Sequence, residues 1–383
     1  MRKFLARPSP DYRLLIKSLI SGVKFDSSML FFNKGRDALV RGLEILDIAP
    51  GAVILVPAYM CDSTIKPLRQ RGYQLIFIDV QDDFNFDLNL VDTMIKEFNV
   101  KVILAVHYFG FSSKIQSLVE LCNAHEVKVI EDCSHSFLTS IGGEPVGSFG
   151  HVAIFSMRKT LPVYDGGALR INETIEYESQ NKSGDSRLGA ELAYLISRLV
   201  ESLVSLIGVP NIYSTKLTGL KERMRALLPH NDNNNIIFNS ITPVRPSFQL
   251  QAYLGSKEYE STIKESRDYH YRILEREIRL LGLKVMAPKS LKDCFPQCLV
   301  VVDETKMLCR WLRDKGVGAV AWPGPELPDK VSMYPTEFPV TTYLNENLVM
   351  LPIHQTLSHR DCMNMIRLLK QWTIDESPCS KNK

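Results

Sequence analysis

The stretch HVAIFSMRKTLPVYDGGAL, residues 151–169, places one lysine where an apolar run gives way to a loop. The run HVAIFS has the composition of a strand that is covered on both faces, and Lys159 stands three residues after Ser156. The glycine pair at 166–167 then permits a close approach of the backbone to a ligand or to another segment. A lysine here can bind a phosphate, remain solvated, or act as a nucleophile if burial and its neighbours lower its pKa.

The residues before this stretch alternate between short β-rich runs and helical patterns. Strand-like runs cover residues 52–58, 74–80, 100–107, 127–132 and 151–156, and helical patterns cover residues 35–46, 62–72, 89–99 and 113–126. This alternation predicts βαβ units and a mostly parallel sheet. Ligands of such sheets bind at the C-terminal ends of the strands, so the residues that follow these runs are the candidates for a site.

The rest of the chain has a different pattern. Residues 187–228 have a helical pattern, PHNDNNN at 229–235 is a polar loop, and residues 248–282 form a long helical pattern. Short strands mixed with helices follow to the C-terminus. We therefore expect a large domain over residues 1–240, and a long linking helix with a smaller α+β domain over residues 241–383.

The composition indicates a cytosolic globular protein. The 383 residues are 45% hydrophobic, and 46 basic residues against 43 acidic ones provide no concentrated basic face for nucleic acid. The eight cysteines form no CxxC pair, and CFPQC at 294–298 has no partnering His/Cys pair, so we expect reduced thiols and no metal site. No run is long enough to span a membrane, and the amphipathic residues 190–210 are expected to face the core or a partner.

Two further groups lie at a predicted helix start and a predicted strand end. In NKGRDAL, residues 33–39, Gly35 opens a helix whose free N–H groups suit a phosphate, and Arg36 adds a cation. In VIEDCSH, residues 129–135, Asp132 ends an apolar strand, where a carboxylate is costly unless it meets a cation or a strong donor. Each feature alone fits an ordinary helix start or cap equally well. Together with a strand-end lysine, they are the parts that pyridoxal phosphate requires.

The chain resembles the sugar aminotransferases of the DegT/StrS type, which are pyridoxal-phosphate enzymes of the fold-type-I aspartate aminotransferase class. The likeness runs from about residue 30 to residue 372, and the stretches that carry it stand in the family's order: NKGRDAL, GAVILVPAYMCDSTI, GYQLIFIDV, VILAVHYFG, VKVIEDCSHS, VGSFGHVAIFS, KTLPVYDGGAL, FQLQAYLGS and LPIHQTLS. The resemblance implies an α/β fold with a mostly parallel large-domain sheet flanked by helices, plus the smaller C-terminal α+β domain.

The resemblance also implies roles for particular residues. Lys159 would attach the cofactor covalently, Asp132 would pair with its pyridine nitrogen, and Ser156 would hold its phosphate together with the helix start Gly35–Arg36–Asp37. Members of the family usually work as homodimers in which a neighbouring chain reaches into each site. They transfer an amino group, usually from glutamate, to a keto sugar that is attached to a nucleotide.

Several residues depart from the family pattern. His135 stands where glutamine is common, and its imidazole can still hydrogen-bond the ring oxygen of the cofactor. Cys61 aligns with the aromatic residue that is expected against the cofactor ring, with Tyr59 as a possible substitute. The loop between the phosphate serine and the lysine is shorter than usual. The usual asparagine before residue 248 is replaced by TPVRPS, in which Arg245 can take over the phosphate contact across the dimer.

The sequence therefore predicts a homodimeric pyridoxal-phosphate aminotransferase that acts on a nucleotide-linked keto sugar in surface polysaccharide or related sugar synthesis. One alternative is a sugar dehydratase of the same family, although the known dehydratase branch has histidine in place of the lysine. Another is a degenerate, non-catalytic binding protein of a biosynthetic assembly, with residues 187–228 as its docking surface. Absorbance of bound cofactor separates this binding protein from both enzymes.

Overall fold

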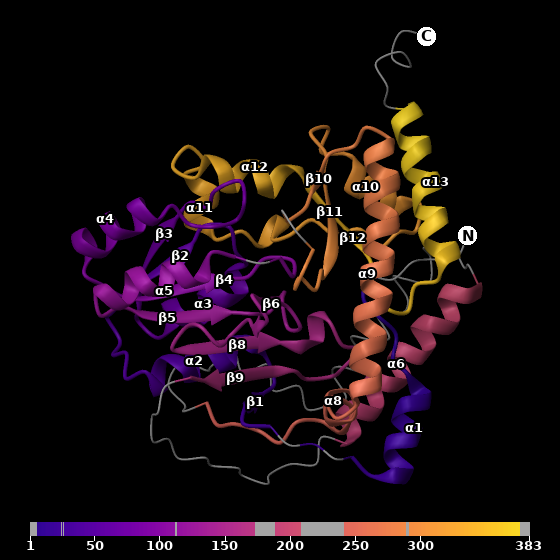
Figure 1. The fold of residues 1–383 in the computed structure, drawn as a ribbon, viewed down its shortest axis with the longest axis horizontal. Helices are drawn as coiled ribbons and strands as arrows, with labels where there is room; N and C mark the ends of the chain where they lie inside the picture. The colour runs from indigo at the N-terminus through magenta and orange to yellow at the C-terminus, as the bar shows by residue number, and fades with distance from the viewer. Residues whose placement is uncertain are drawn as a thin grey trace.

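A computed structural model describes residues 6–23, 25, 27–111, 113–172, 188–207, 241–288 and 291–375 of the chain. The larger domain is built on a seven-stranded sheet with the order β1-β9-β8-β5-β4-β2-β3 (Figure 1). These strands are β1 (Leu30–Phe32), β2 (Val53–Pro57), β3 (Gln74–Ile78), β4 (Val100–Val106), β5 (Lys128–Asp132), β8 (Val152–Ser156) and β9 (Gly167–Ile171). The pairs from β3 through to β8 are parallel, whereas β9 pairs antiparallel with both β8 and β1. The prediction of a mostly parallel sheet is confirmed.

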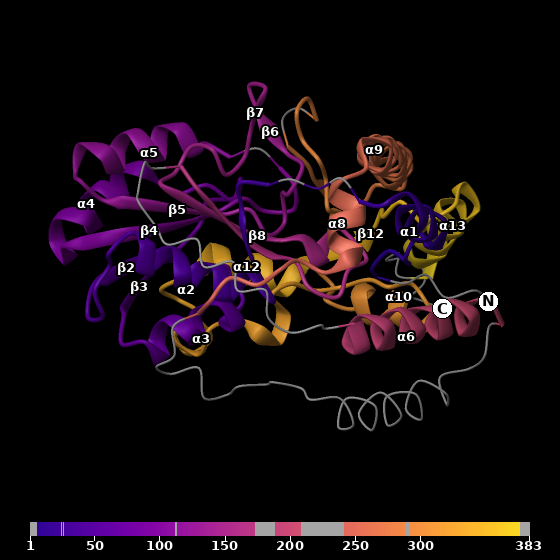
Figure 2. The same ribbon diagram turned by 90° about the horizontal axis from the view of Figure 1, so that it is seen from below.

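Helices cover both faces of this sheet (Figure 2). On one side lie α2 (Gly35–Ile45) and α3 (Asp62–Gln70), and on the other lie α4 (Leu88–Phe98) and α5 (Ile115–Ala124). Successive strand residues point to opposite faces: in β2, Ile54 and Val56 join the cluster under α2 and α3, while Leu55 joins the cluster under α4 and α5. Burial on both faces explains why the strands are apolar throughout instead of alternating.

The C-terminal part forms the predicted smaller α+β domain. Its antiparallel sheet has the order β10-β11-β12, with strands at Val285–Met286, Cys298–Val302 and Leu348–Pro352. Helices α10 (Leu308–Asp314) and α13 (His359–Asp375) share a hydrophobic cluster with this sheet. Between β11 and β12, a segment containing η2 (Gly324–Glu326), α11 (Asp329–Met333) and α12 (Pro339–Asn347) returns to the larger domain, where Val331 packs with Phe77 of β3.

The prediction of one continuous helix over residues 248–282 is wrong. The structure has two helices there, α8 (Phe248–Leu254) and α9 (Lys257–Leu280). Gly255 ends the first helix, and the hydroxyl of Ser256 accepts a hydrogen bond from the N–H of Tyr259 at 3.2 Å, which caps the second. The apolar periodicity continues across this break, so it does not reveal the break, whereas the Gly-Ser pair does.

Two helices outside the domain cores complete the described chain, with a small hairpin formed by β6 (Ser140–Ile141) and β7 (Glu144–Pro145). Helix α1 (Tyr12–Ser21) lies beside α6 (Leu188–Ile207), and the Tyr12 hydroxyl donates to the Leu195 carbonyl at 3.2 Å. The helical prediction over 187–228 agrees with α6, but its remainder and the polar loop at 229–235 lie outside the described residues. Among the helices that are described, none is long and apolar enough to cross a membrane.

Candidate functional site

The C-terminal ends of β5 and β8 bring the predicted site residues together. Asp132, the last residue of β5, pairs in register with Ile154 of β8. Ser156 ends β8, and the short helix η1 (Met157–Lys159) follows it directly and carries Lys159. Because the two strands are parallel neighbours, Asp132, Ser156 and Lys159 lie at the same edge of the sheet, where α/β folds bind ligands.

The amine of Lys159 lies in a half-buried position that lowers its pKa. Burial is the main cause of the lowered pKa, and the charges of Arg7 and Arg158 act in the same direction. Asp132 and Cys61 act in the opposite direction without reversing the shift. A lowered pKa leaves more of the amine unprotonated near neutral pH, as a nucleophile or a general base requires.

Asp132 and His135 form the buried side of the site. Asp132 is 7% exposed, and its Oδ1 accepts a hydrogen bond from the N–H of Ser134 at 2.9 Å. The imidazole of His135 stacks on Phe109 with ring centroids 5.6 Å apart. Burial and then the charge of Lys159 lower the pKa of His135 well below its usual value, so this ring is neutral at neutral pH. Its Nδ1 is buried and has no hydrogen-bond partner among the described residues. Buried polar atoms normally have such a partner, so this atom is a candidate for contact with a ligand.

The start of α2 lies against the end of β8, as the prediction of a shared phosphate site requires. A Cβ atom on Gly35 would lie 3.1 Å from the carbonyl oxygen of Phe155 and 3.4 Å from Cβ of Ser156. The Asp37 carboxylate accepts a hydrogen bond from the N–H of Lys34 at 3.1 Å and so caps α2. This capping role gives the acidic Asp37 a structural function beside an anion-ready helix start, and leaves Gly35 and Arg36 as the stronger candidates for phosphate contact.

The glycine pair after the lysine allows this close packing. Gly166 has φ +135°, and its carbonyl accepts a hydrogen bond from the N–H of Met157 at 2.7 Å, which closes the lysine loop. A Cβ atom on Gly167 would lie only 2.3 Å from the carbonyl oxygen of Lys34. The absence of a side chain at residue 167 is therefore what lets the strand after the lysine lie directly against the first turn of α2.

Arg158 is a candidate that the sequence analysis did not select. It stands between Ser156 and Lys159, and its Nε is buried without a hydrogen-bond partner among the described residues. Burial, followed by the nearby charges of Arg7 and Arg36, lowers the pKa of Arg158. Three guanidinium groups close to a helix N-terminus form a cationic site that suits an anion such as a phosphate. The adjacent cations in SMRK were the only signal of this in the sequence.

Cys61 and Tyr59, the two candidates for the ring-contacting position, are both engaged elsewhere. Burial and a hydrogen bond to Glu326 raise the pKa of the Cys61 thiol, whose Sγ donates to the carboxylate at 2.6 Å. Tyr59 is completely buried, and its hydroxyl donates to the carbonyl oxygen of Trp322 at 2.5 Å. The buried ring of Tyr59 therefore offers no free face to the site, and Cys61 has no aromatic ring.

Trp322 enters the site from the smaller domain. Its ring centroid lies 4.6 Å from that of His135 at an interplanar angle of 77°, and Nζ of Lys159 lies 5.9 Å from the centroid of the same ring. No sequence signal marked this residue. Trp322 is far from Lys159 in the sequence, and it reaches the site only because the smaller domain packs against the larger one.

Comparison with known proteins relates part of the chain to a family. Residues 26–182, which contain the helix start, Asp132 and Lys159, match the model of the DegT/DnrJ/EryC1/StrS aminotransferase family. This region of the chain is similar to that family.

Two curated relatives match part of the chain. The UDP-N-acetyl-3-dehydro-alpha-D-glucosamine 3-aminotransferase of Acidithiobacillus ferrooxidans is 31% identical over 147 residues, which cover 38% of this chain and 40% of that protein. GDP-perosamine synthase of Vibrio cholerae is 30% identical over 146 residues, which cover 37% of this chain and 40% of that protein. The chain thus matches about two fifths of the length of these relatives.

Solved structures of aminotransferases share the fold of this chain. Spr1654 of Streptococcus pneumoniae, in its PMP form, superposes with a TM-score of 0.69 at 16% identity and covers 99% of this chain and 100% of that one. PseC of Helicobacter pylori, an aminotransferase involved in the biosynthesis of pseudoaminic acid, gives a TM-score of 0.65 at 16% identity and covers 98% and 100%. The predicted fold class is confirmed.

The segment predicted to reach a neighbouring subunit is held at both ends. The N–H of Val244 donates to the carbonyl of Phe31 at 2.8 Å, and the N–H and hydroxyl of Ser247 donate to the Asp165 carboxylate at 2.8 and 2.6 Å. Arg245, between these anchors, is exposed and forms no hydrogen bond or ion pair with the described residues. Because Asp165 belongs to the lysine loop, this segment is attached directly to the site.

Glu131 has a structural role beside the site. Its fully buried carboxylate accepts hydrogen bonds from Nε2 of His107 at 2.8 Å and from three backbone N–H groups of residues 147–150 at 2.6–2.9 Å. Burial by itself would raise the pKa of Glu131, but these donors outweigh it and lower the pKa. His107, Glu131 and Cys133 are close enough to hold a metal ion, yet Glu131 already has these donors and burial keeps the Cys133 thiol protonated by raising its pKa. The expectation of no metal site stays a prediction.

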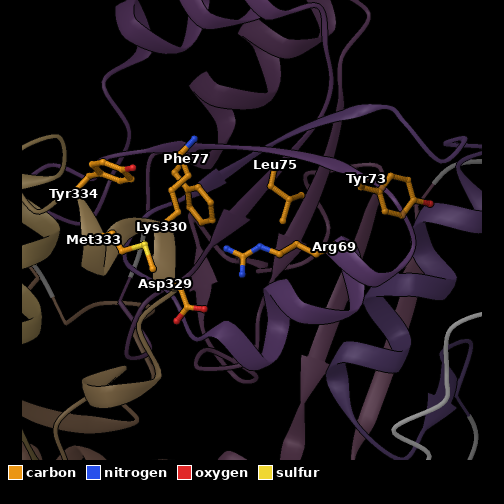
Figure 3. A pocket seen from close by; sticks show the side chains of 8 residues that line it. All are labelled: Arg69, Tyr73, Leu75, Phe77, Asp329, Lys330, Met333 and Tyr334. Carbon is orange, nitrogen blue, oxygen red and sulfur yellow. The ribbon is translucent and has the colours of Figure 1, made fainter.

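The surface also has a hollow that lies away from these residues. It has a volume of about 510 Å³ and opens between α3, β3 and α11 (Figure 3). Its walls contain none of the residues gathered around Lys159, and they consist of Arg69, Tyr73, Leu75, Phe77, Asp329, Lys330, Met333 and Tyr334. The volume of this hollow alone does not make it the candidate site, because the residues that sequence analysis predicted for the site lie at the ends of β5 and β8 instead.

Proposed function

We propose that the chain is a pyridoxal-phosphate aminotransferase that transfers an amino group from glutamate to a nucleotide-linked keto sugar, in surface polysaccharide or related sugar synthesis. One observation carries the proposal: Asp132 and Lys159 lie at the ends of two adjacent parallel strands, and the buried Nδ1 of His135 beside them is unpaired. The curated relatives named above, which act on or make nucleotide sugars, support the choice of substrate.

The donor set fits this cofactor. Ser156, Arg36 and Arg158, with the start of α2, would hold its phosphate, since they gather cations and free donors around one helix N-terminus. Asp132 would hold the proton of the pyridine nitrogen, and His135 would bind a polar substituent of the ring through Nδ1. When bound, pyridoxal phosphate supplies an electron sink for the carbon from which a proton is removed.

The residues of the chain then have distinct tasks. The Lys159 amine would attach the cofactor, and when it is free Nζ would take up a proton from one carbon and return it to another. Its lowered pKa keeps Nζ ready to accept that proton. Lys159 also favours amino transfer over the dehydratase alternative, and an intact set of Asp132, His135 and Lys159 is more than a non-catalytic binding protein needs.

We also propose a homodimer in the cytoplasm. All cysteines of the described residues are free thiols, and several are fully buried, which is typical of proteins from a reducing compartment. The exposed Arg245 is the basis for the dimer, because its guanidinium has no partner among the described residues and suits a phosphate on a neighbouring chain.

The visible spectrum tests the enzymatic proposal. Protein purified with pyridoxal phosphate should absorb visible light through the bound cofactor, and adding glutamate should convert the spectrum to that of the aminated cofactor. A protein without cofactor absorbance would contradict the proposal and favour the non-catalytic alternative. A spectrum that does not respond to glutamate would leave the cofactor but exclude glutamate as the amino donor.

Mixing of two impaired variants tests the role of Arg245. Lys159→Ala and Arg245→Ala chains, mixed and allowed to exchange subunits, should recover part of the activity, because one site of each hybrid dimer then contains both groups. Mixing Lys159→Ala with Asp132→Asn is the matched control: both residues belong to one chain's site, so no hybrid site is complete. Sedimentation should show a dimer at micromolar concentration. A fully loaded monomer, or a dimer in which mixing restores nothing, would contradict the shared site.

A further inference from the structure

We propose that Trp322 of the smaller domain forms the aromatic wall of the cofactor site on the larger domain. The inference deepens the proposed function and rests on it, since it assigns a further binding residue to the same site. Its starting point is the position of Nζ of Lys159 over the Trp322 ring, 5.9 Å from the centroid. The face of the indole is thus turned toward the amine that would attach the cofactor.

The loop that carries Trp322 is fixed to the larger domain by two hydrogen bonds. Both come from the residues that follow β2: the Tyr59 hydroxyl donates to the Trp322 carbonyl at 2.5 Å, and the Cys61 thiol donates to the Glu326 carboxylate at 2.6 Å. On the other side, Val320 forms an antiparallel bridge with Met350 of β12. The loop therefore spans from the small sheet to the site, and its backbone position does not depend on the indole alone.

Other aromatic rings hold the indole in its orientation. It meets the rings of Tyr59, Phe109 and His135 edge to face, with centroids 5.2, 5.9 and 4.6 Å away and interplanar angles of 88°, 89° and 77°. Such contacts fix the plane of a ring more firmly than apolar packing alone. A ring fixed in this way is pre-organised to bind a flat ligand and loses little conformational freedom on binding.

The neighbouring aromatic side chains are not available for this role. Tyr59 is 0% exposed, Phe109 is 1% exposed and Tyr108 is 4% exposed, and all three lie beneath the site as part of the core. Trp322 is only half-buried, as is Lys159. Of these rings, the indole is the one that can face both the amine and an incoming ligand.

The chemistry of the ligand agrees with this wall. A pyridine ring is flat and aromatic, and contacts between aromatic rings contribute to affinity beyond the area that they bury. With no cofactor bound, the indole face attracts the cationic form of Lys159 through a cation–π contact. The same indole face can thus contact the Lys159 amine before the cofactor binds and the pyridine ring of the cofactor afterwards.

The test uses cofactor-free whole protein with pyridoxal phosphate as the probe. In titrations followed by visible absorbance, Trp322→Leu should bind about tenfold more weakly than the wild type, whereas Trp322→Phe, which retains a ring, should stay within about threefold. Trp311→Phe is the matched control, because Trp311 packs on Trp372 at 5.4 Å in the cluster of the smaller domain. Its affinity should equal that of the wild type.

Tryptophan emission provides a second readout, since the chain has three tryptophans. Loading with pyridoxal phosphate should quench a larger fraction of the emission in Trp311→Phe, which retains Trp322, than in Trp322→Phe, which lacks it. Equal quenching in the two variants, or wild-type affinity in Trp322→Leu, would each overturn the proposal. If Trp322→Leu does not fold, the quenching comparison decides. Failure of the proposed function would appear differently, as a wild-type protein that binds no cofactor at all.

Discussion

Replacing Lys159 by alanine is expected to reduce amino transfer by at least about four powers of ten, because one amine serves both as covalent attachment point and as proton carrier. The fold should survive, since the side chain is half-buried and forms no hydrogen bond that holds the loop. The loop is closed instead by backbone contacts, such as the Met157 N–H to the Gly166 carbonyl at 2.7 Å. Turnover with glutamate and a keto sugar nucleotide, together with a thermal melt, measures both effects.

Lys101→Ala is the matched control for this variant, because Lys101 is exposed on β4 and should be dispensable. In the wild type, borohydride should fix the cofactor covalently, and peptide mapping should locate the adduct on Lys159. An adduct on Lys34 or Lys101 would contradict the assignment, as would a Lys159→Ala protein that is still fixed by borohydride.

Changing Asp132 to asparagine is expected to lower turnover by several powers of ten while the protein remains folded. An amide cannot stabilise the protonated pyridine nitrogen that the electron sink requires. The structure favours a clean result, because an asparagine oxygen can still accept the hydrogen bond that Oδ1 receives from the Ser134 N–H at 2.9 Å. Asp132→Glu should also be poor, since the longer side chain misplaces the carboxylate at a site that is 7% exposed.

The control for Asp132 is Asp87→Asn. Asp87 also accepts hydrogen bonds from backbone N–H groups, as the N-cap of α4, and asparagine caps helices as well as aspartate does. This variant should retain wild-type turnover and stability. Near-normal turnover in Asp132→Asn would show that Asp132 has a structural role only, and loss of cooperative unfolding would show that the carboxylate is needed for the fold.

Local sequence patterns were sufficient to predict five strands of the large sheet, which are β2, β3, β4, β5 and β8, and the residues that follow them. The apolar runs that end at Asp132 and Ser156 are β5 and β8, and the structure pairs these two strands as parallel neighbours. The lysine and its glycine pair are contiguous in sequence with β8. A site residue that ends or directly follows a strand can therefore be predicted once that strand is recognised in the sequence.

Residues that reach the site through tertiary packing could not be found in this way. Trp322 belongs to a loop of the other domain, and its position depends on hydrogen bonds from Tyr59 and Cys61. The positive charge of Arg7, near the N-terminus, lowers the pKa of both Arg158 and Lys159, although Arg7 is far from them in the sequence. The antiparallel strand β9 was also missed, because it begins at the second glycine of the pair and no α-helix separates it from β8.

The contact between Gly167 and the first turn of α2 limits how this chain can vary. Any side chain at residue 167 would push its first carbon into the backbone at Lys34 and Gly35, which cannot move aside as a flexible side chain can. The displaced turn would carry Arg36 with it, so a change on one strand would disturb an anion site formed by another element. A library of random variants should therefore tolerate substitutions at the exposed Gly189, where a Cβ meets nothing within 4 Å, and reject them at Gly167, although neither glycine has a side chain to offer a ligand.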